Sequence, residues 1–250
     1  MAKNTSLLKI EGTLGELTFY KSQDGFLVKT KSGVSKQRID NDPAFSRTRE
    51  NGKEFGEIAR SGKVLRTAIR PLLLEAKDTK VTSRLVKVMG AVKNSDATSQ
   101  RGERTVFNGL ATDLGKSYLK GFDFNNKAVL GSILYSAMEV DSSTGVITLN
   151  QLRPKLEIAA PSGSTHVTLL SASANVDFLT EDFSLSLSNT ETIAVHDVNP
   201  VDVVLTPQAV PSGSGTSMLF FLMSFSQEVN GSLYDLRNGA YNVLNLIEVL

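Results

Sequence analysis

The spacing of apolar residues changes at about residue 120, and this change limits the fold more than any other feature of the chain. Before it, apolar residues recur every three to four positions, as between Val81 and Val92, which is typical of amphipathic helices. After it, short runs are separated by Gly, Pro, Ser and Asn, which is typical of strands and turns. We therefore predict an α+β protein with a hairpin and helical domain at 1–119 and an antiparallel β-sandwich at 120–250.

Two runs of the second half indicate how its strands are buried. The run DFSLSLSN alternates apolar and polar residues, so we expect Phe183, Leu185 and Leu187 to face inward. The run MLFFLMSF at Met218–Phe225 is apolar on both faces of a strand. It predicts a central strand that is covered on both sides.

A hairpin is predicted near the N-terminus. The runs LTFYK (Leu17–Lys21) and FLVKTK (Phe26–Lys31) flank the turn sequence Ser-Gln-Asp-Gly. An isolated hairpin is marginal in water, so it must pack on the helices of its own chain or on a neighbour. The polar stretch 32–41 lacks apolar periodicity and is predicted to be a surface loop or an extended basic arm. The hairpin side chains we expect to make contacts are Phe19, Tyr20, Phe26 and Val28.

A long basic helix is predicted to follow, because Asp42 is a good N-cap and Pro43 suits the first helical position. Pro71 should break or kink it. Three glycines at 52, 56 and 62 weaken the intrinsic stability of this helix, so tertiary packing must stabilise it. Close approach of another backbone would explain why glycine occurs at these positions. Its buried face is predicted to hold Phe55, Ile58, Leu65, Ile69, Leu72 and Leu73.

Basic residues are concentrated in the first half of the chain. Residues 1–125 contain 23 Lys or Arg and 14 Asp or Glu, whereas residues 126–250 contain four and 12. Halves of opposite charge attract one another within or between molecules, and the basic half alone would suit an acidic partner. Different composition of helices and strands also explains the difference. The side chains we select as contacts for assembly or an anionic partner are Lys29, Lys31, Lys36, Arg38, Arg47, Arg49, Arg60, Lys63, Arg66 and Arg70.

The cations of the long helix, from Arg47 to Arg70, form a basic stripe that has a second interpretation. Glu50, Glu54 and Glu57 alternate with its cations at spacings that make ion pairs within one helix, which would make it an ordinary solvated surface. If it is functional instead, its cations would neutralise phosphates of a nucleic acid.

The sequence contains little that indicates catalysis. The chain has no cysteine, which excludes disulfides and thiolate chemistry, and its two histidines, His166 and His196, are expected to make ordinary hydrogen bonds. No phosphate-binding or dinucleotide motif is present. We therefore expect no enzyme activity, no cofactor, no metal and no small-molecule substrate.

Targeting signals are also missing from the printed sequence. The first residues lack the apolar segment and cleavage site of a secretory signal, so we expect synthesis in the cytoplasm. Later release of the protein, or its incorporation into a particle, is compatible with this expectation. No apolar run is long enough to span a membrane.

The first 105 residues resemble a family of uncharacterised bacterial proteins. The resemblance lies in EGTLGELTFYKSQDGFLVKTKSGVSK, NDPAFSRTRENGKEFG, GKVLRTAIRPLL and RLVKVM, with a looser match in EVNGSLYDLRNGAYNVL near the C-terminus. It implies a glycine-bearing hairpin followed by a basic helical segment, and it implies no catalytic residue.

These observations favour a non-enzymatic structural protein that assembles with copies of itself, as a subunit of a filament, tube, shell or phage-like particle. The hairpin or basic arm of one subunit would lie on the acidic sandwich of the next. The alternatives are a nucleic-acid-associated protein that uses the basic stripe, and a sandwich module that binds carbohydrate or protein through its loops.

Overall fold

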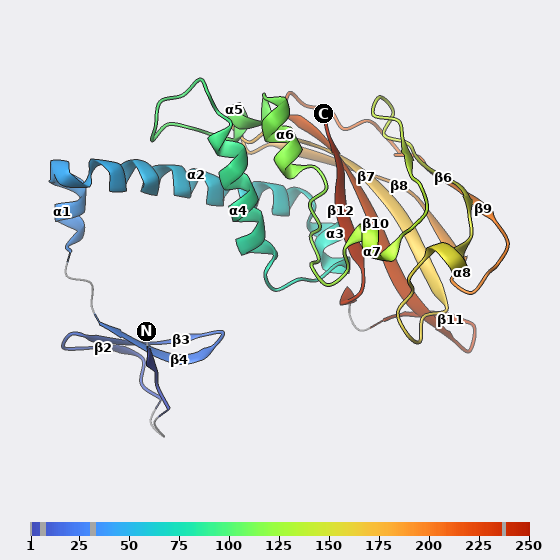
Figure 1. Ribbon diagram of the computed structural model, residues 1–250, viewed down its shortest axis with the longest axis horizontal. Coiled ribbons are helices and arrows are strands. Elements are labelled where there is room, and N and C mark those ends of the chain that lie inside the picture. Colours follow the sequence, from blue (N-terminus) through green and yellow to red (C-terminus); the bar gives the residue numbers. More distant parts are fainter. Residues whose placement is uncertain (1, 6–8, 31–33, 237–238) are drawn as a thin grey trace. The chain divides into compact units, whose positions relative to one another are not determined.

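The computed structural model describes residues 2–5, 9–30, 34–236 and 239–250 (Figure 1). The chain divides into two compact units, one ending at Arg49 and the other beginning at Glu50. The fold is α+β, with an N-terminal sheet, a helical region and antiparallel sheets packed together, as predicted.

The first unit contains a four-stranded antiparallel sheet in the order β1-β4-β3-β2. The predicted hairpin is confirmed, since Leu17 pairs with Thr30 and Ser22 with Gly25. Gly15 lies in the turn between β2 and β3 with φ +57°, a conformation that favours glycine. The elements of this unit are β1 (Ala2–Lys3), β2 (Gly12–Leu14), β3 (Leu17–Ser22), β4 (Gly25–Thr30), α1 (Lys36–Asn41) and the 3-10 turn η1 (Pro43–Phe45).

The stretch predicted as a loop or extended arm is instead helical from Lys36 onward, so that prediction was wrong. The side chain of Ser35 caps α1 by accepting a hydrogen bond from the amide of Arg38, which replaces a missing helical bond. Lys, Gln and Arg in this helix are good helix formers, and α1 buries no residue that would have produced an apolar period.

The long helix α2 (Ser46–Ala68) begins after η1, whose first turn is capped by Asp42. It ends just before Pro71, which lies in the first turn of the next helix, so the predicted break is confirmed. The helices that follow α2 are α3 (Arg70–Glu75), α4 (Val81–Asn94), α5 (Val106–Leu110) and α6 (Asp113–Leu119).

The buried face of α2 is close to the predicted one, with one error. Ile58 and Leu65 are buried, but Phe55 is 61% exposed. Glu54 takes the buried position instead. It lies eleven residues before Leu65, which is about three full turns, so the two side chains are on the same side of the helix, whereas Phe55 points about 100° away from that side.

Two antiparallel sheets form the β-rich part of the second unit. The larger has the order β11-β10-β7-β8, with β12 also paired to β10, and the smaller has the order β5-β6-β9. These strands are β5 (Glu139–Val140), β6 (Ile147–Leu152), β7 (His166–Val176), β8 (Phe183–Ala194), β9 (Val201–Leu205), β10 (Thr216–Val229), β11 (Ser232–Asp235) and β12 (Val243–Val249). The short helices are α7 (Leu130–Ile133) and α8 (Pro154–Glu157).

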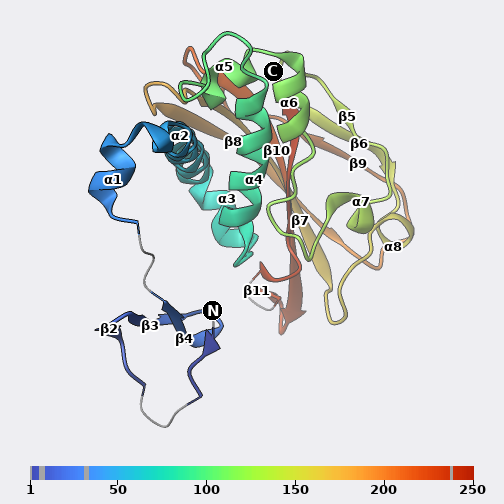
Figure 2. The same cartoon turned by 60° about the vertical axis from the view of Figure 1, so that its left-hand side comes forward.

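Strand β10 separates two hydrophobic cores, which confirms it as a central strand. Phe220 and Leu222 belong to a core shared with α2 to α6, whereas Phe221 and Met223 belong to a core shared with the smaller sheet. The second unit therefore has three layers, with helices on one face of the large sheet and the small sheet on the other (Figures 1 and 2).

The edge strand β8 follows its predicted alternation only in part. Leu185 and Leu187 pack against the helical core, whereas Phe183, at the start of the strand, is 47% exposed. The boundary predicted between Leu119 and Lys120 stays a prediction. The helices before it and the strands after it contribute to one core.

Candidate assembly surface and basic stripe

One face of the N-terminal sheet carries most of its large apolar side chains, together with Lys21 and Thr30. The register places Phe19 opposite Val28, and strand alternation puts Leu17 and Phe26 on the same face. Leu14 extends this face onto β2, where it pairs with Leu17. Leu14 is 72% exposed and Leu17 is 43% exposed. We call these five side chains (Leu14, Leu17, Phe19, Phe26 and Val28) the apolar face.

The opposite face of this sheet is more polar. Thr13 and Thr18 form a pair directly across the strands, with their hydroxyl oxygens 3.2 Å apart. Tyr20 lies on this face, and the Lys29 ammonium sits 5.5 Å from the centre of its ring. Of the four hairpin residues chosen from the sequence, the structure brings Phe19, Phe26 and Val28 onto one face and places Tyr20 on the other.

The basic residues chosen from the sequence fall into separate groups. Lys29 lies on β4, Lys36 and Arg38 lie on α1, and Lys31 lies outside the described residues. Arg38 pairs with Asp42 within one turn at 3.3 Å, with side chains that are 63% and 34% exposed. These cations therefore belong to a sheet and a short helix and do not form a continuous arm.

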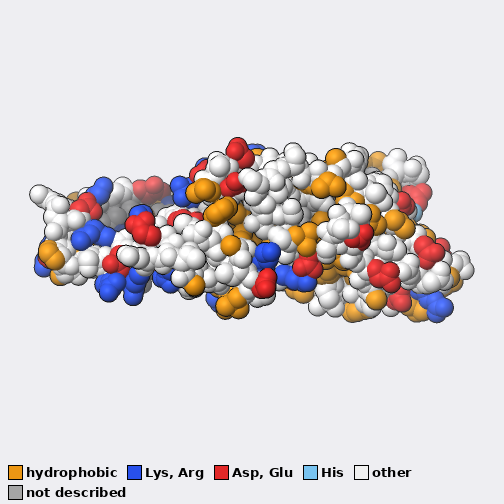
Figure 3. Space-filling model, turned by 90° about the horizontal axis from the view of Figure 1, so that it is seen from above, with side chains coloured by type: hydrophobic (Ala, Val, Ile, Leu, Met, Phe, Trp, Pro, Cys, Tyr) orange, Lys and Arg blue, Asp and Glu red, His pale blue; other side chains and the backbone are white. Residues whose placement is uncertain are grey.

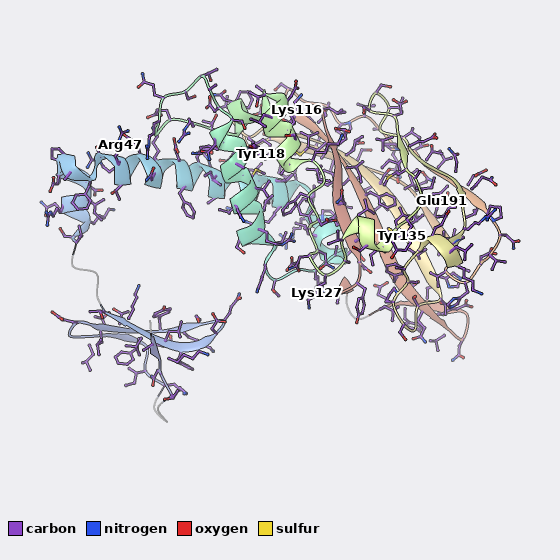
Figure 4. All side chains as sticks on the ribbon, viewed as in Figure 1. Arg47, Lys116, Tyr118, Lys127, Tyr135 and Glu191 are labelled. Carbon is purple, nitrogen blue, oxygen red and sulfur yellow. The ribbon has the colours of Figure 1, made fainter. Side chains whose placement is uncertain are left out.

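Arg47 and Arg49 lie in the first turn of α2, and Arg47 can be seen in Figure 4. The Arg49 guanidinium donates hydrogen bonds to the carbonyl oxygens of Ile39 and Asp42, at 2.7 and 3.0 Å. Arg49 thus joins the end of α1 to the start of α2, which is a structural role within the first unit.

Further along α2, the cations of the basic stripe differ in their surroundings. Arg60 lies 3.6 Å from the Glu181 carboxylate in an exposed ion pair. Lys63, Arg66 and Arg70 line one pocket, together with Lys77, which sequence reasoning missed. Lys77 follows the end of α3 and carries no periodic signal, so only the fold brings it to the other three.

The prediction of ion pairs within the helix was wrong for Glu54, whose cationic partners lie outside α2. Glu54 is buried and binds Lys93 of α4 at 2.5 Å and Arg104 at 2.8 Å, and it accepts a hydrogen bond from the Gly102 amide. Glu50 pairs with Arg101, and Glu57 accepts a hydrogen bond from the Val106 amide. These carboxylates tie α2 to the segment 95–106, because a buried carboxylate requires donors from several elements.

The donors around Glu54 set its charge state. The hydrogen bond from Arg104 lowers the pKa of Glu54 from 4.5 to about 2, against the opposing effect of burial, with further help from Lys93 and the Gly102 amide. Glu54 is therefore ionised at neutral pH. We call Glu54, Lys93 and Arg104 the buried ion cluster.

Three other features are relevant to chemistry. His166 shares a 2.9 Å hydrogen bond with the Thr165 hydroxyl, and His196 is exposed. Within the described residues, no group of three or more His, Cys, Asp or Glu side chains is placed to hold a metal ion. In the same part of the chain, no helix has the length and apolar character needed to cross a membrane.

A second hollow of about 380 Å³ lies beside α4 and α6, with Val88, Ala91, Tyr118 and Phe122 among its lining residues. Tyr118 extends from α6, as Figure 4 shows, and is 47% exposed. This hollow is mainly apolar and contains no carboxylate among its lining residues.

No family model, no curated protein and no solved structure matches this chain. The resemblance of residues 1–105 to an uncharacterised bacterial family therefore stays a prediction.

Proposed function

We propose that this chain is a non-enzymatic structural subunit that assembles with copies of itself through its N-terminal sheet. The observation that carries the proposal is that, among the described residues up to Arg49, none is buried, although their sheet has an apolar face. A sheet with one apolar face is stable when that face packs against another layer. A second copy of the chain is the partner to which we commit.

Charge supports a head-to-tail contact between copies. Residues 1–49 contain nine Lys or Arg and five Asp or Glu, whereas residues 50–250 contain 18 and 21, so the two units have opposite net charge. On the face seen in Figure 3, the charged side chains over the strands are mostly acidic. A basic surface that meets an acidic one on the next copy makes a heterologous contact, which propagates unless a ring closes it.

The test compares two paired substitutions on opposite faces of the same two strands. Leu14→Asp with Leu17→Asp places two charges on the apolar face, whereas Thr13→Asp with Thr18→Asp places two charges on the opposite face. We expect the leucine variant to be a 27 kDa monomer by size-exclusion light scattering, and the threonine variant to assemble as the wild type does. Negative-stain electron microscopy then shows whether the wild-type assembly is a filament, tube or shell.

Two results would contradict the proposal. A wild-type protein that is monomeric at every salt concentration would mean that the sheet does not join copies. Loss of assembly in both paired variants would mean that the apolar face is not the contact.

Deletion of residues 1–34, which ends before the cap of α1 at Ser35, should also abolish assembly.

A further inference from the structure

A basic pocket of about 410 Å³ lies within the second unit, where the end of α2, helix α3 and the start of α4 meet. Four cationic side chains line it, namely Lys63, Arg66, Arg70 and Lys77. Helical spacing places Lys63, Arg66 and Arg70 on one side of α2 and α3, and the fold adds Lys77, which follows α3.

The four cations of this pocket lack carboxylate partners in the part of the chain that the structure describes. Among the described residues, none of the four cations forms an ion pair, in contrast to Arg60, which pairs with Glu181. Asp78 also lines the pocket, but its carboxylate binds the Arg84 guanidinium at 2.7 Å and accepts a hydrogen bond from the Lys80 amide. The pocket therefore concentrates positive charge that an anion would compensate.

The start of helix α4 adds to this positive charge. Its N-cap residue, Lys80, provides no side-chain hydrogen bond, so the first turn keeps free amide groups. The Arg66 guanidinium donates a 3.0 Å hydrogen bond to the Thr82 hydroxyl, which fixes Arg66 beside this turn. Arginine next to a helix N-terminus is suited to binding phosphate oxygens.

The remaining walls are apolar. Leu73, Ala76 and Val81 line the pocket beside the cations, and its volume is within the range of small-molecule sites. We infer that the pocket binds a small phosphate-bearing molecule of nucleotide size, with its phosphates at Arg66, Arg70 and the start of α4 and its apolar part against Leu73 and Val81. This inference goes beyond assembly, does not depend on it, and revises the expectation that no small molecule binds.

Calorimetric titration of the full-length protein tests the inference, with ATP and sodium pyrophosphate as probes at about 50 mM salt, where screening is weak. The test variant is Lys63→Gln with Lys77→Gln, which removes two charges from the pocket. The matched control is Arg153→Gln with Lys155→Gln, which removes two exposed charges from residues of the same unit that do not line the pocket. Circular dichroism of each variant shows whether its fold is retained.

We expect ATP to bind more tightly than pyrophosphate, the pocket variant to lose about tenfold or more in affinity, and the control to stay within about twofold. The backbone amide signals of Thr82 and Ser83 should shift when pyrophosphate is added. Equal weakening in both variants, or no binding of either probe at millimolar concentration, would overturn the inference. Tighter binding of a single-stranded DNA than of ATP would also overturn it and would favour the nucleic-acid alternative.

Discussion

The two units of this chain differ in where their apolar side chains lie. In the second unit, β10 supplies alternate residues to two cores, and side chains such as Phe220 and Phe221 are fully buried. In the first unit, the described residues form a regular sheet without burying any side chain, and Leu14 is 72% exposed. Backbone pairing is thus enough to define a strand register, but the stability of a unit depends on apolar burial.

The units also differ in how deeply their ion pairs are buried. The second unit buries Glu54 and Lys93 side by side, with side chains that are 5% and 6% exposed. Arg38 and Asp42 of the first unit form an ion pair that is far more open to solvent. Exposed pairs add little to stability, whereas removing one partner of a buried pair leaves an uncompensated charge. The five predictions below test this contrast, from the largest expected effect to the smallest.

The largest expected loss comes from the core of the second unit. Phe220→Ala should lower the free energy of unfolding by about 4 kcal/mol, because it removes a fully buried ring that packs 6.0 Å from Phe124. Phe26→Ala in the first unit should lower it by less than about 1 kcal/mol, because that ring is only partly buried. Urea unfolding in the Leu14→Asp, Leu17→Asp background, which we expect to be monomeric, measures both losses, and equal losses would contradict the contrast between the units.

The buried ion cluster should be nearly as sensitive. Glu54→Gln should cost about 3 kcal/mol, because Lys93 would keep its charge in a buried position without a carboxylate. Glu103→Gln is the matched control, since its pair with Lys53 is exposed, and should cost less than about 0.5 kcal/mol. Chemical denaturation at neutral pH gives both values. A similar cost for the two variants would show that burial does not decide the energy of these pairs.

Acid should weaken the second unit through the same carboxylate. The pKa of Glu54 is lowered from 4.5 to about 2, so its contribution to stability is complete above pH 4.5 and is lost as the pH falls toward 2. Asp96, whose pKa is also lowered by hydrogen bonds that outweigh its burial, adds to the loss at low pH. We expect thermal unfolding of Glu54→Gln to depend less on pH between 4.5 and 2 than that of the wild type, and parallel curves would contradict this.

The exposed start of α2 offers a gain in stability. Gly52→Ala and Gly56→Ala should each raise the free energy of unfolding by up to about 1 kcal/mol, because alanine favours helix and a Cβ at either position meets no atom within 4 Å. Gly109→Ala should have the opposite sign, because its Cβ would lie 2.1 Å from the Val92 carbonyl oxygen. Melting temperatures test all three, and a loss at Gly52 or Gly56 would show that a partner covers that face of the helix.

The smallest expected effect comes from removing the first sheet. Deletion of residues 1–34 should change the unfolding free energy of the remaining chain by less than about 0.5 kcal/mol, because neither core contains a residue from the first unit. Hydrogen exchange of the β10 amides measures this directly. A large loss of protection would mean that the second unit needs the first.

Several parts of the fold could be predicted from the sequence because they depend on short-range rules. The hairpin follows from the turn at Ser22–Gly25, the helix break follows from Pro71, and the central strand follows from the apolar run at Met218–Phe225. Turn geometry, the missing proline donor and strand alternation each depend on a few neighbouring residues. The α+β class follows from the change of period near residue 120.

The candidate surfaces were less predictable, because long-range contacts decide them. The sequence marked Lys63, Arg66 and Arg70 as basic, but only the meeting of α2, α3 and α4 brings Lys77 to the same pocket. It indicated Glu54 as a partner of neighbouring cations, whereas Lys93 and Arg104 reach it from positions 39 and 50 residues away.

Helix α1 was not predicted from the sequence for a related reason. It buries no side chain, so its sequence contains no apolar residues at helical spacing. The sequence by itself determined which segments are strands and long helices, since those follow local chemistry. The tertiary structure alone decided which charges of the second unit are buried in pairs, as for Glu54 with Lys93, because burial and pairing depend on residues far apart in the chain.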